Sequence, residues 1–254
     1  MRLAVQLYTL RAKLAEDVPG TLDALAEAGA EEVELAGLYD RTAGDMRALL
    51  DAAGLKAAST HARLERLQPE PEAVLEEART LGVETVIVPW VPTPESDSAA
   101  DEVVGRIVEA GAAVKDAGLR FGYHTHGYEM VPSPDGTLFD TLAKALDPKL
   151  VHFQVDVFHT YHGGADPVAL MTKYTGRVRS LHLKDIKKGY PRETGKGTAT
   201  PDADVPVGTG QIDWPAVLRA AMKAGATEYY VEDESTDPLT HIPQSLAYLQ
   251  GLKL

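Results

Sequence analysis

The sequence contains no cysteine among its 254 residues. This absence excludes disulfide bonds, thiolate nucleophiles and zinc sites built on cysteine, and it fits a reducing compartment. No run approaches the roughly 18 apolar residues that a membrane helix needs. The N-terminus meets Arg11 and Lys13 before any long apolar segment, unlike a signal peptide. We therefore expect a soluble, cytoplasmic protein.

Positive charge is also scarce. The chain carries 25 Lys and Arg against 38 Asp and Glu, a net charge of −13. Because a negative field of this size repels nucleic-acid phosphates and anionic lipids, we expect neither nucleic acid nor a membrane as a partner. Hydrophobic residues make up 44% of the chain and charged residues 25%, a balance typical of folded globular proteins rather than disordered or fibrous ones.

What the sequence does contain is a recurring joint between two kinds of segment. Stretches rich in alanine and charge end at a glycine and lead into a short β-branched run, at Gly29, Gly54, Gly82, Gly118 and Gly225. Glycine just past a helix adopts the left-handed conformation that closes the last turn. The joints therefore predict helices that alternate with strands.

The alternation predicts an α/β fold, a single (β/α)8 TIM barrel over residues 1–254, because about 250 residues and eight units suffice for one. The predicted strands cover 3–7, 32–35, 56–60, 85–88, 120–124, 152–157, 177–183 and 229–232. The predicted helices cover 19–28, 45–53, 70–81, 99–117, 137–146, 167–174, 215–224 and 240–249. An open doubly wound sheet is the alternative, but no glycine-rich phosphate loop follows the first strand.

Polar residues gather at the predicted strand ends. Six of the eight histidines lie in or just after them, at positions 61, 124, 126, 159, 162 and 182. The other polar or aromatic residues there are Tyr8, Glu34, Trp90, Glu129, Asp156, Lys184, Asp185, Glu232 and Glu234. In a barrel these ends meet in one mouth, where active sites lie. The alternatives are a hydrogen-bonded polar layer over the core and a simple Lys184–Asp185 ion pair.

Three of these residues predict a metal site. Asp156, His182 and Glu232 end three different strands at similar depth, so they could share one ion with a fourth ligand from the fifth strand. Neutral imidazole and carboxylate bind divalent Mn, Co, Zn, Fe or Mg. We therefore expect one divalent ion as cofactor.

Seven motifs carry a resemblance to a known family. They are VQLYTLR at 5–11, VELAGLY at 33–39, YHTHGYE at 123–129, DVFH at 156–159, HLKD at 182–185, VGTGQIDW at 207–214 and YYVEDES at 229–235. In this order, from residue 2 to about 249, the chain resembles the xylose isomerase-like sugar phosphate isomerase/epimerase barrels. The resemblance implies a divalent metal held by a fifth-strand Glu and by Asp156, His182 and Glu232, with His159 binding substrate.

The fifth strand departs from the family pattern. Where the two-glutamate epimerases place a ligand glutamate, this sequence has His124, and Glu129 follows further along. His124 is the first choice for the fourth ligand, and His126 or Glu129 would contact substrate instead. Tyr8, Glu34, His61, Trp90 and His159 are the further expected substrate contacts.

The predicted function is a metal-dependent isomerase or epimerase of a hydroxy-carbonyl sugar, sugar phosphate or cyclitol. Glu232 is the expected general base, with His124 or Glu129 on the other substrate face, and Lys184 would neutralise developing oxyanion charge. Loss of a β-hydroxyl after the same proton abstraction would make the enzyme a dehydratase, and the sequence leaves both outcomes open.

The sequence also bears on two rival functions and on the oligomeric state. Metal-dependent cleavage of damaged DNA needs several metals and a basic groove, but the fourth strand ends in Val88-Pro89-Trp90, without a histidine. A non-catalytic carbohydrate-binding barrel is the rival from another class. Relatives often pair through mouth loops, so we expect a homodimer; the irregular segment 187–211 could reach a partner or fold over its own site.

Overall fold

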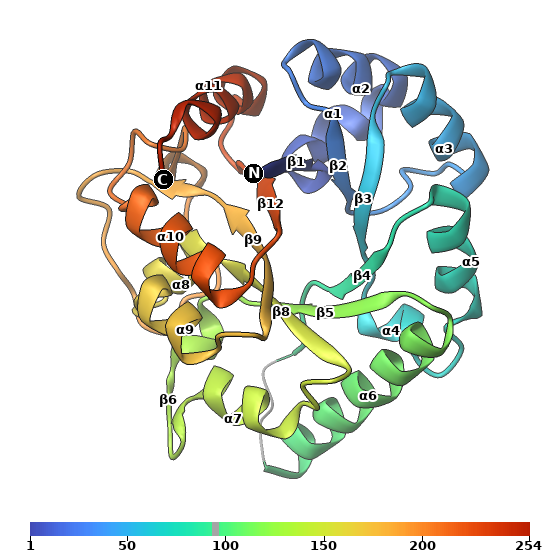
Figure 1. The fold of residues 1–254 in the computed structure, drawn as a ribbon. Helices are drawn as coiled ribbons and strands as arrows, with labels where there is room; N and C mark the ends of the chain where they lie inside the picture. Colours follow the sequence, from blue (N-terminus) through green and yellow to red (C-terminus); the bar gives the residue numbers. More distant parts are fainter. Residues whose placement is uncertain (93–96) are drawn as a thin grey trace.

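Residues 1–92 and 97–254 are described by a computed structural model, and they contain a closed barrel of parallel strands. The order around the barrel is β1-β12-β9-β8-β5-β4-β3-β2. Figure 1 shows these strands around a common centre, with the helices outside them. The predicted α/β fold, a (β/α)8 TIM barrel, is confirmed, and the open doubly wound sheet is excluded because the strands close on themselves.

The predicted strands and helices are all present, with ends within two residues of the expected ones. The barrel strands are β1 (Arg2–Gln6), β2 (Glu32–Leu35), β3 (Lys56–His61), β4 (Thr85–Val88), β5 (Arg120–His124), β8 (Val151–Asp156), β9 (Val178–Leu183) and β12 (Glu228–Val231). The outer helices are α2 (Val18–Glu27), α3 (Ala43–Ala52), α5 (Glu72–Leu81), α6 (Asp97–Asp116), α7 (Leu138–Ala145), α9 (Pro167–Lys173), α10 (Trp214–Ala224) and α11 (Pro238–Gly251).

Short elements that the sequence pattern did not predict follow the strand ends. They are η1 (Leu7–Leu10), α1 (Arg11–Glu16), α4 (Leu64–Leu67), η2 (Tyr128–Met130), β6 (Pro132–Ser133), β7 (Gly136–Thr137), α8 (Val157–His162), β10 (Asp185–Ile186), η3 (Pro201–Ala203) and β11 (Asp204–Val205). α8 begins directly after β8, and the Asp156 carboxylate caps it by accepting the His159 backbone N–H at 2.7 Å. One site residue thus also fixes where the next helix starts.

Local chemistry explains the helix boundaries. Thr42 and Thr137 each form a capping box with the aspartate three residues later, at the start of α3 and α7. At the other end, Gly82 and Gly225 adopt left-handed conformations, with φ of 74° and 103°, and end α5 and α10. The predicted glycine joints are therefore real helix ends.

The inside of the barrel contains a small cluster of its own. Ala4, Ala58 and Tyr230 form a small buried cluster of their own, apart from the main core between strands and helices. Because side chains alternate along a strand, the residue two positions after Tyr230, Glu232, points to the same interior. A carboxylate therefore follows this cluster at the carboxyl end of β12.

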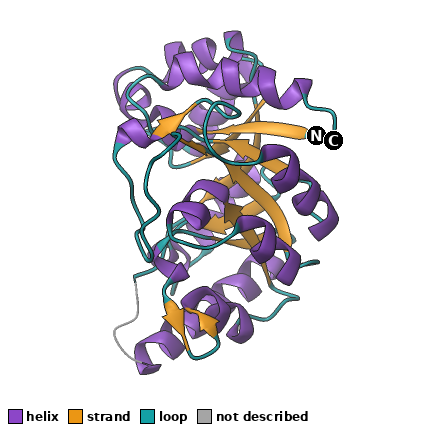
Figure 2. Cartoon of the chain, turned by 90° about the vertical axis from the view of Figure 1, so that its left-hand side faces the viewer, coloured by secondary structure: helices purple, strands orange, loops and turns teal. Residues whose placement is uncertain are grey.

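The segment 187–211 folds against its own barrel. The Glu193 N–H donates to the His162 carbonyl at 2.7 Å, and the Gly195 N–H donates to the Gly163 carbonyl at 3.2 Å. A Cβ at Gly127 would lie 1.9 Å from the Lys196 carbonyl oxygen, so only glycine permits this approach. Figure 2 shows the long loops on the side of the barrel opposite the two chain ends. None of the helices in the described ranges could cross a membrane.

Candidate active site

A pocket of about 520 Å³ opens at the carboxyl ends of the strands. This volume suits a small organic substrate. Nine of the twelve predicted site residues line it, namely Tyr8, His61, Trp90, His124, His126, His159, His182, Lys184 and Glu232. The segment 187–211 contributes residues 197–199, 201 and 204 to the lining. The predicted residues thus converge on one cavity from many strands.

Asp156 comes together with His182 and Glu232, two residues of the pocket lining. One ligand atom of each lies within 4.8 Å of those of the others, and all three side chains are buried. His182 Nδ1 lies 2.7 Å from Glu232 Oε2 and 3.9 Å from Asp156 Oδ2. Burial and the nearby Glu232 carboxylate raise the pKa of Asp156 to about 7.

The donor set fits a divalent cation. Asp156 Oδ2 is buried and has no hydrogen-bond partner within residues 1–92 and 97–254. An unpaired buried oxygen is costly unless something binds it. Two carboxylates and one imidazole are ligands that Zn, Mn, Co and Fe accept. These observations support the predicted three-residue site.

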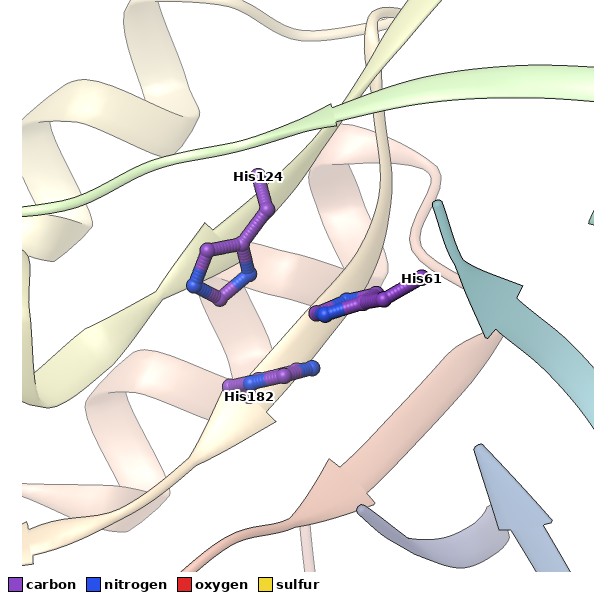
Figure 3. Close-up of side chains that lie close together, drawn as sticks. All are labelled: His61, His124 and His182. Atoms are coloured by element: carbon purple, nitrogen blue, oxygen red, sulfur yellow. The ribbon is translucent and has the colours of Figure 1, made fainter. Parts of the chain in front are cut away.

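His124 belongs to a second group instead. Ligand atoms of His61, His124 and His182 lie within 4.8 Å of one another. The rings of His61 and His182 stack with their centroids 5.4 Å apart. The His124 ring is tilted relative to that of His182, and the centroids of these two rings are 4.4 Å apart (Figure 3). Asp156, His182 and Glu232, three of the four predicted ligands, therefore form one group. The fourth, His124, belongs to the other group, and the two groups have only His182 in common.

Glu34 lies below the pocket, which it does not line. It is fully buried and accepts hydrogen bonds on both carboxylate oxygens. Its donors are Gln6 Nε2 at 2.6 Å, His182 Nε2 at 2.6 Å, Ser59 Oγ at 2.5 Å and Gln154 Nε2 at 2.9 Å, and His61 Nε2 lies at 3.1 Å. Burial alone would raise its pKa, but the two histidines lower it below the usual range.

Gln154 is a site residue that sequence reasoning missed. Its Oε1 accepts from His61 Nε2 at 2.9 Å and from His124 Nδ1 at 2.8 Å. The available signal was a polar residue inside strand β8, two positions before Asp156 and hence on the same face. Gln6 ends β1 in the equivalent way, and its Oε1 accepts the Tyr8 backbone N–H at 3.0 Å.

Lys184 is buried and paired with carboxylates that the sequence did not assign to it. Its Nζ lies 2.5 Å from Glu234 and 3.6 Å from Asp204, both of which line the pocket. Burial lowers its pKa, but Asp204, Glu232 and Glu234 raise it above the usual value. The alternative Lys184–Asp185 ion pair is wrong, because Asp185 accepts from the Gly208 backbone and the Trp214 indole.

Glu129 does not line the cavity. Its oxygens accept from the Tyr123 hydroxyl and the His126 backbone N–H, each at 2.7 Å. The carboxyl is fully buried, and burial raises its pKa to about 7 against the lowering effect of these bonds. The observed contacts hold the turn that carries His126.

His126 and His159 face the pocket side by side. Their ring centroids are 4.9 Å apart, and Nδ1 of each is buried without a partner among the described residues. Tyr8 and Trp90 are about half exposed and complete the wall, with the Arg11 guanidinium 4.1 Å from the centre of the Tyr8 ring. The wall thus combines aromatic faces with hydrogen-bonding groups.

Comparisons with known proteins agree with this architecture. An inosose dehydratase of Geobacillus kaustophilus is 27% identical over 205 residues, which are 68% of this chain and 66% of that enzyme. The rhizopine catabolism protein MocC of Rhizobium meliloti is 27% identical over 245 residues, 85% of this chain and 74% of that protein. The chain spans only about half of an inosose dehydratase of Clostridium perfringens, 48% of its length.

Solved structures extend the likeness over nearly the whole chain. A sugar phosphate isomerase/epimerase from Parabacteroides distasonis has a TM-score of 0.80 at 27% identity and covers 98% of this chain and 93% of its own. The IolI protein with a bound zinc atom shares the fold, with a TM-score of 0.72 at 18% identity over 98% of this chain and 96% of its own. The sequence model of one family matches residues 22–252, so this chain belongs to the xylose isomerase-like TIM barrel family.

Proposed function

We propose that this protein is a divalent metal-dependent enzyme that removes a proton beside the carbonyl of a sugar or cyclitol, and that it then eliminates water. The observation that carries the proposal is the grouping of Asp156, His182 and Glu232 within 4.8 Å at a pocket of about 520 Å³, which His182 and Glu232 line. The names of the curated relatives, inosose dehydratases, support elimination as the outcome.

Asp156, His182 and Glu232 would hold the ion, with His124 as the proposed fourth ligand. A bound divalent ion polarises a carbonyl and an adjacent hydroxyl, which makes the neighbouring C–H more acidic. Glu232 lines the pocket and is the proposed general base. Burial raises its pKa, but His182 and Lys184 lower it, so the carboxylate is ionised and able to accept a proton.

The remaining wall residues have proposed roles in handling charge and hydroxyl groups. Lys184 is protonated and can stabilise negative charge on a substrate oxygen. His126 and His159 present imidazoles to substrate hydroxyls. Asp204 lines the pocket, burial raises its pKa to about 7, and it is the proposed donor of a proton to the departing hydroxyl.

Isomerisation or epimerisation is the second candidate. The structure from Parabacteroides distasonis that matches at a TM-score of 0.80 is named a sugar phosphate isomerase/epimerase. Both reactions begin with the same proton abstraction, and they differ in where the proton returns and whether a hydroxyl leaves.

NMR in deuterated water tests the proposal on purified protein loaded with Mn²⁺, Co²⁺ or Zn²⁺. Keto-cyclitols and keto-sugars are screened for loss of the C–H signal and for the product. We expect exchange with elimination, and exchange without elimination would favour the isomerase. Binding without exchange for every metal would contradict both candidates and identify a carbohydrate-binding barrel. The Asp156→Asn variant, which lacks one proposed metal ligand, is the matched control for dependence of the reaction on the metal.

A further inference from the structure

We infer that Glu34 and Gln154 are positioning residues that fix the ring nitrogens of His61, His124 and His182. In this arrangement His182 presents Nδ1 and His124 presents Nε2 towards the pocket, while both nitrogens of His61 are engaged in the hydrogen-bond network. The ion would then bind to the group of Asp156, His182 and Glu232 and not to the three-histidine group. This inference rests on the proposed metal-dependent function.

The argument starts with the amide of Gln154. An ionised carboxylate only accepts hydrogen bonds, so the Gln154 group 2.9 Å from Glu34 Oε2 must be the NH₂. Its oxygen therefore faces His61 Nε2 at 2.9 Å and His124 Nδ1 at 2.8 Å. An amide oxygen also only accepts, so both ring nitrogens must carry hydrogen.

For His124 this assignment leaves Nε2 as the nitrogen with a lone pair. The ring is buried, and its Nδ1 carries the hydrogen that Gln154 Oε1 accepts. A neutral imidazole with Nδ1–H has its lone pair on Nε2. Because Gln154 holds the opposite side of the ring, His124 turns this lone pair towards the pocket that it lines.

The same reasoning excludes His61 as a ligand of the ion. Its Nε2–H points at Gln154 Oε1 and at Glu34 Oε1, 3.1 Å away. Its Nδ1 faces Gln6 Nε2 at 3.5 Å, and Gln6 must donate there because its Oε1 accepts the Tyr8 N–H. A metal ligand needs a free lone pair, and the Nε2 of His61 offers none. His61, His124 and His182 therefore lie close together, but the hydrogen on His61 Nε2 prevents the three rings from binding one ion together.

Glu34 acts on His182. The Glu34 carboxylate accepts from His182 Nε2 at 2.6 Å, so the other ring nitrogen, Nδ1, lies on the side of Asp156 and Glu232. Without metal, Nδ1 donates to Glu232 Oε2 at 2.7 Å, and an ion bound to the three residues would replace that hydrogen. Metal-binding histidines usually donate their second ring N–H to a carboxylate or carbonyl, which fixes the ring and raises its basicity. The Glu34 carboxylate is held in place by four other groups, on Gln6, Ser59, His61 and Gln154.

Zinc affinity tests the inference on the chain of residues 1–254, stripped with a chelator and titrated against a chromophoric competitor. Glu34→Gln should weaken zinc binding about 10- to 100-fold, as loss of an outer-shell partner does. His61→Gln should stay within about tenfold of wild type, and Asp156→Asn should lose the most. Wild-type affinity in Glu34→Gln, or a larger loss in His61→Gln than in Asp156→Asn, would overturn the inference.

A second measurement needs no substitution at Glu34, and therefore does not depend on how that variant folds. In metal-free wild-type protein labelled with ¹⁵N-histidine, long-range ¹H–¹⁵N correlations should report hydrogen on Nε2 of His61 and on Nδ1 of His124. His61→Gln and His124→Gln identify the signals. The opposite tautomers would refute the inference whether or not the protein binds metal. A wild-type chain that takes up no zinc, with these tautomers in place, would instead contradict the proposed function.

Discussion

Two polar regions lie one above the other in the barrel, and they differ in how their atoms are partnered. The polar layer, defined as Gln6, Glu34, Ser59 and Gln154, bonds both oxygens of Glu34 and satisfies the amides of both glutamines. The pocket floor, defined as His126, Asp156 and His159, has an unpartnered buried atom on each residue, within the described part of the chain.

This difference distinguishes the polar layer, whose residues hold other side chains in position, from the pocket floor, whose residues bind a ligand. A buried polar group with a partner costs little, whereas a buried group without one costs about 1–3 kcal/mol of stability. The polar layer avoids that cost without any ligand, and it can therefore hold the histidines rigidly. The pocket floor carries the cost in the protein alone, and an ion or substrate that supplies the missing bonds removes it.

The largest expected effect concerns the base. Glu232→Gln keeps the size of the side chain and one ligand oxygen but cannot accept a proton. Loss of a positioned base typically lowers the rate about 10²- to 10⁴-fold, and a weaker metal site would deepen the loss. The measurement is the rate of deuterium exchange into substrate.

Glu84→Gln is the control for this substitution, because Glu84 is exposed and pairs with Arg120 at the opposite end of the barrel. Its exchange rate should equal that of the wild type. Equal rates in the wild type and Glu232→Gln would remove Glu232 as the base, and His124 would then be the remaining candidate on the pocket wall.

Removing the metal should lower thermal stability. An ion present at 100 times its dissociation constant stabilises the folded state by about 2.7 kcal/mol, and for a chain of this size that corresponds to a shift of about 5–10 °C. Differential scanning calorimetry with and without a chelator measures it. In Asp156→Asn the chelator should change little, and a wild-type melting curve that ignores both chelator and added metal would exclude the site.

A third prediction contrasts Glu129 with Glu34, two buried carboxylates with both oxygens bonded. Two histidines face Glu34 and lower its pKa, whereas burial raises the pKa of Glu129 to about 7 from an unfolded value of 4.5. The folded state therefore binds a proton more tightly than the unfolded state. The contribution of Glu129 to stability is fully present below pH 4.5 and is lost as the pH rises through 7.

The test compares urea unfolding of the wild type and Glu129→Gln between pH 5 and pH 8. Glutamine does not ionise, so the stability of the wild type relative to the variant should fall on the order of 2 kcal/mol over this range. A disturbed hydrogen bond from the His126 N–H would change the stability of the variant by the same amount at every pH, so it does not alter how the stability difference depends on pH. A difference that is independent of pH would show that Glu129 titrates in its ordinary range.

The barrel itself was predictable because its signals are local. Glycine joints such as Gly82 and Gly225 end helices by their own conformational freedom, and the β-branched runs after them need no distant partner to be recognised. The same holds for Asp156, His182 and Glu232, because carboxyl ends of parallel strands meet wherever a barrel closes.

The partnerships around these residues were not predictable. Whether Glu34 faces the pocket or lies beneath it depends on strand register, and β2 and β3 shift register between Val33 and Glu34. Asp204 reaches Lys184 only because the long segment after β9 folds back and pairs β11 with β10. Contacts of this kind depend on loop packing, which leaves no periodic pattern in the sequence.

The smallest expected effects test the opening comparison directly, because two substitutions should change stability in opposite directions. Ser59→Ala removes a donor from Glu34 Oε2 in the polar layer, and should cost about 1 kcal/mol. His159→Phe replaces a floor residue whose Nδ1 has no partner in the described chain by a ring of similar shape. It should stabilise the metal-free protein by about 1 kcal/mol while substrate conversion falls, since binding groups are often unfavourable for stability. Both values come from urea unfolding of chelator-treated protein. If both variants are destabilised equally, the pocket floor is as well partnered as the polar layer, with ordered water as the natural partner.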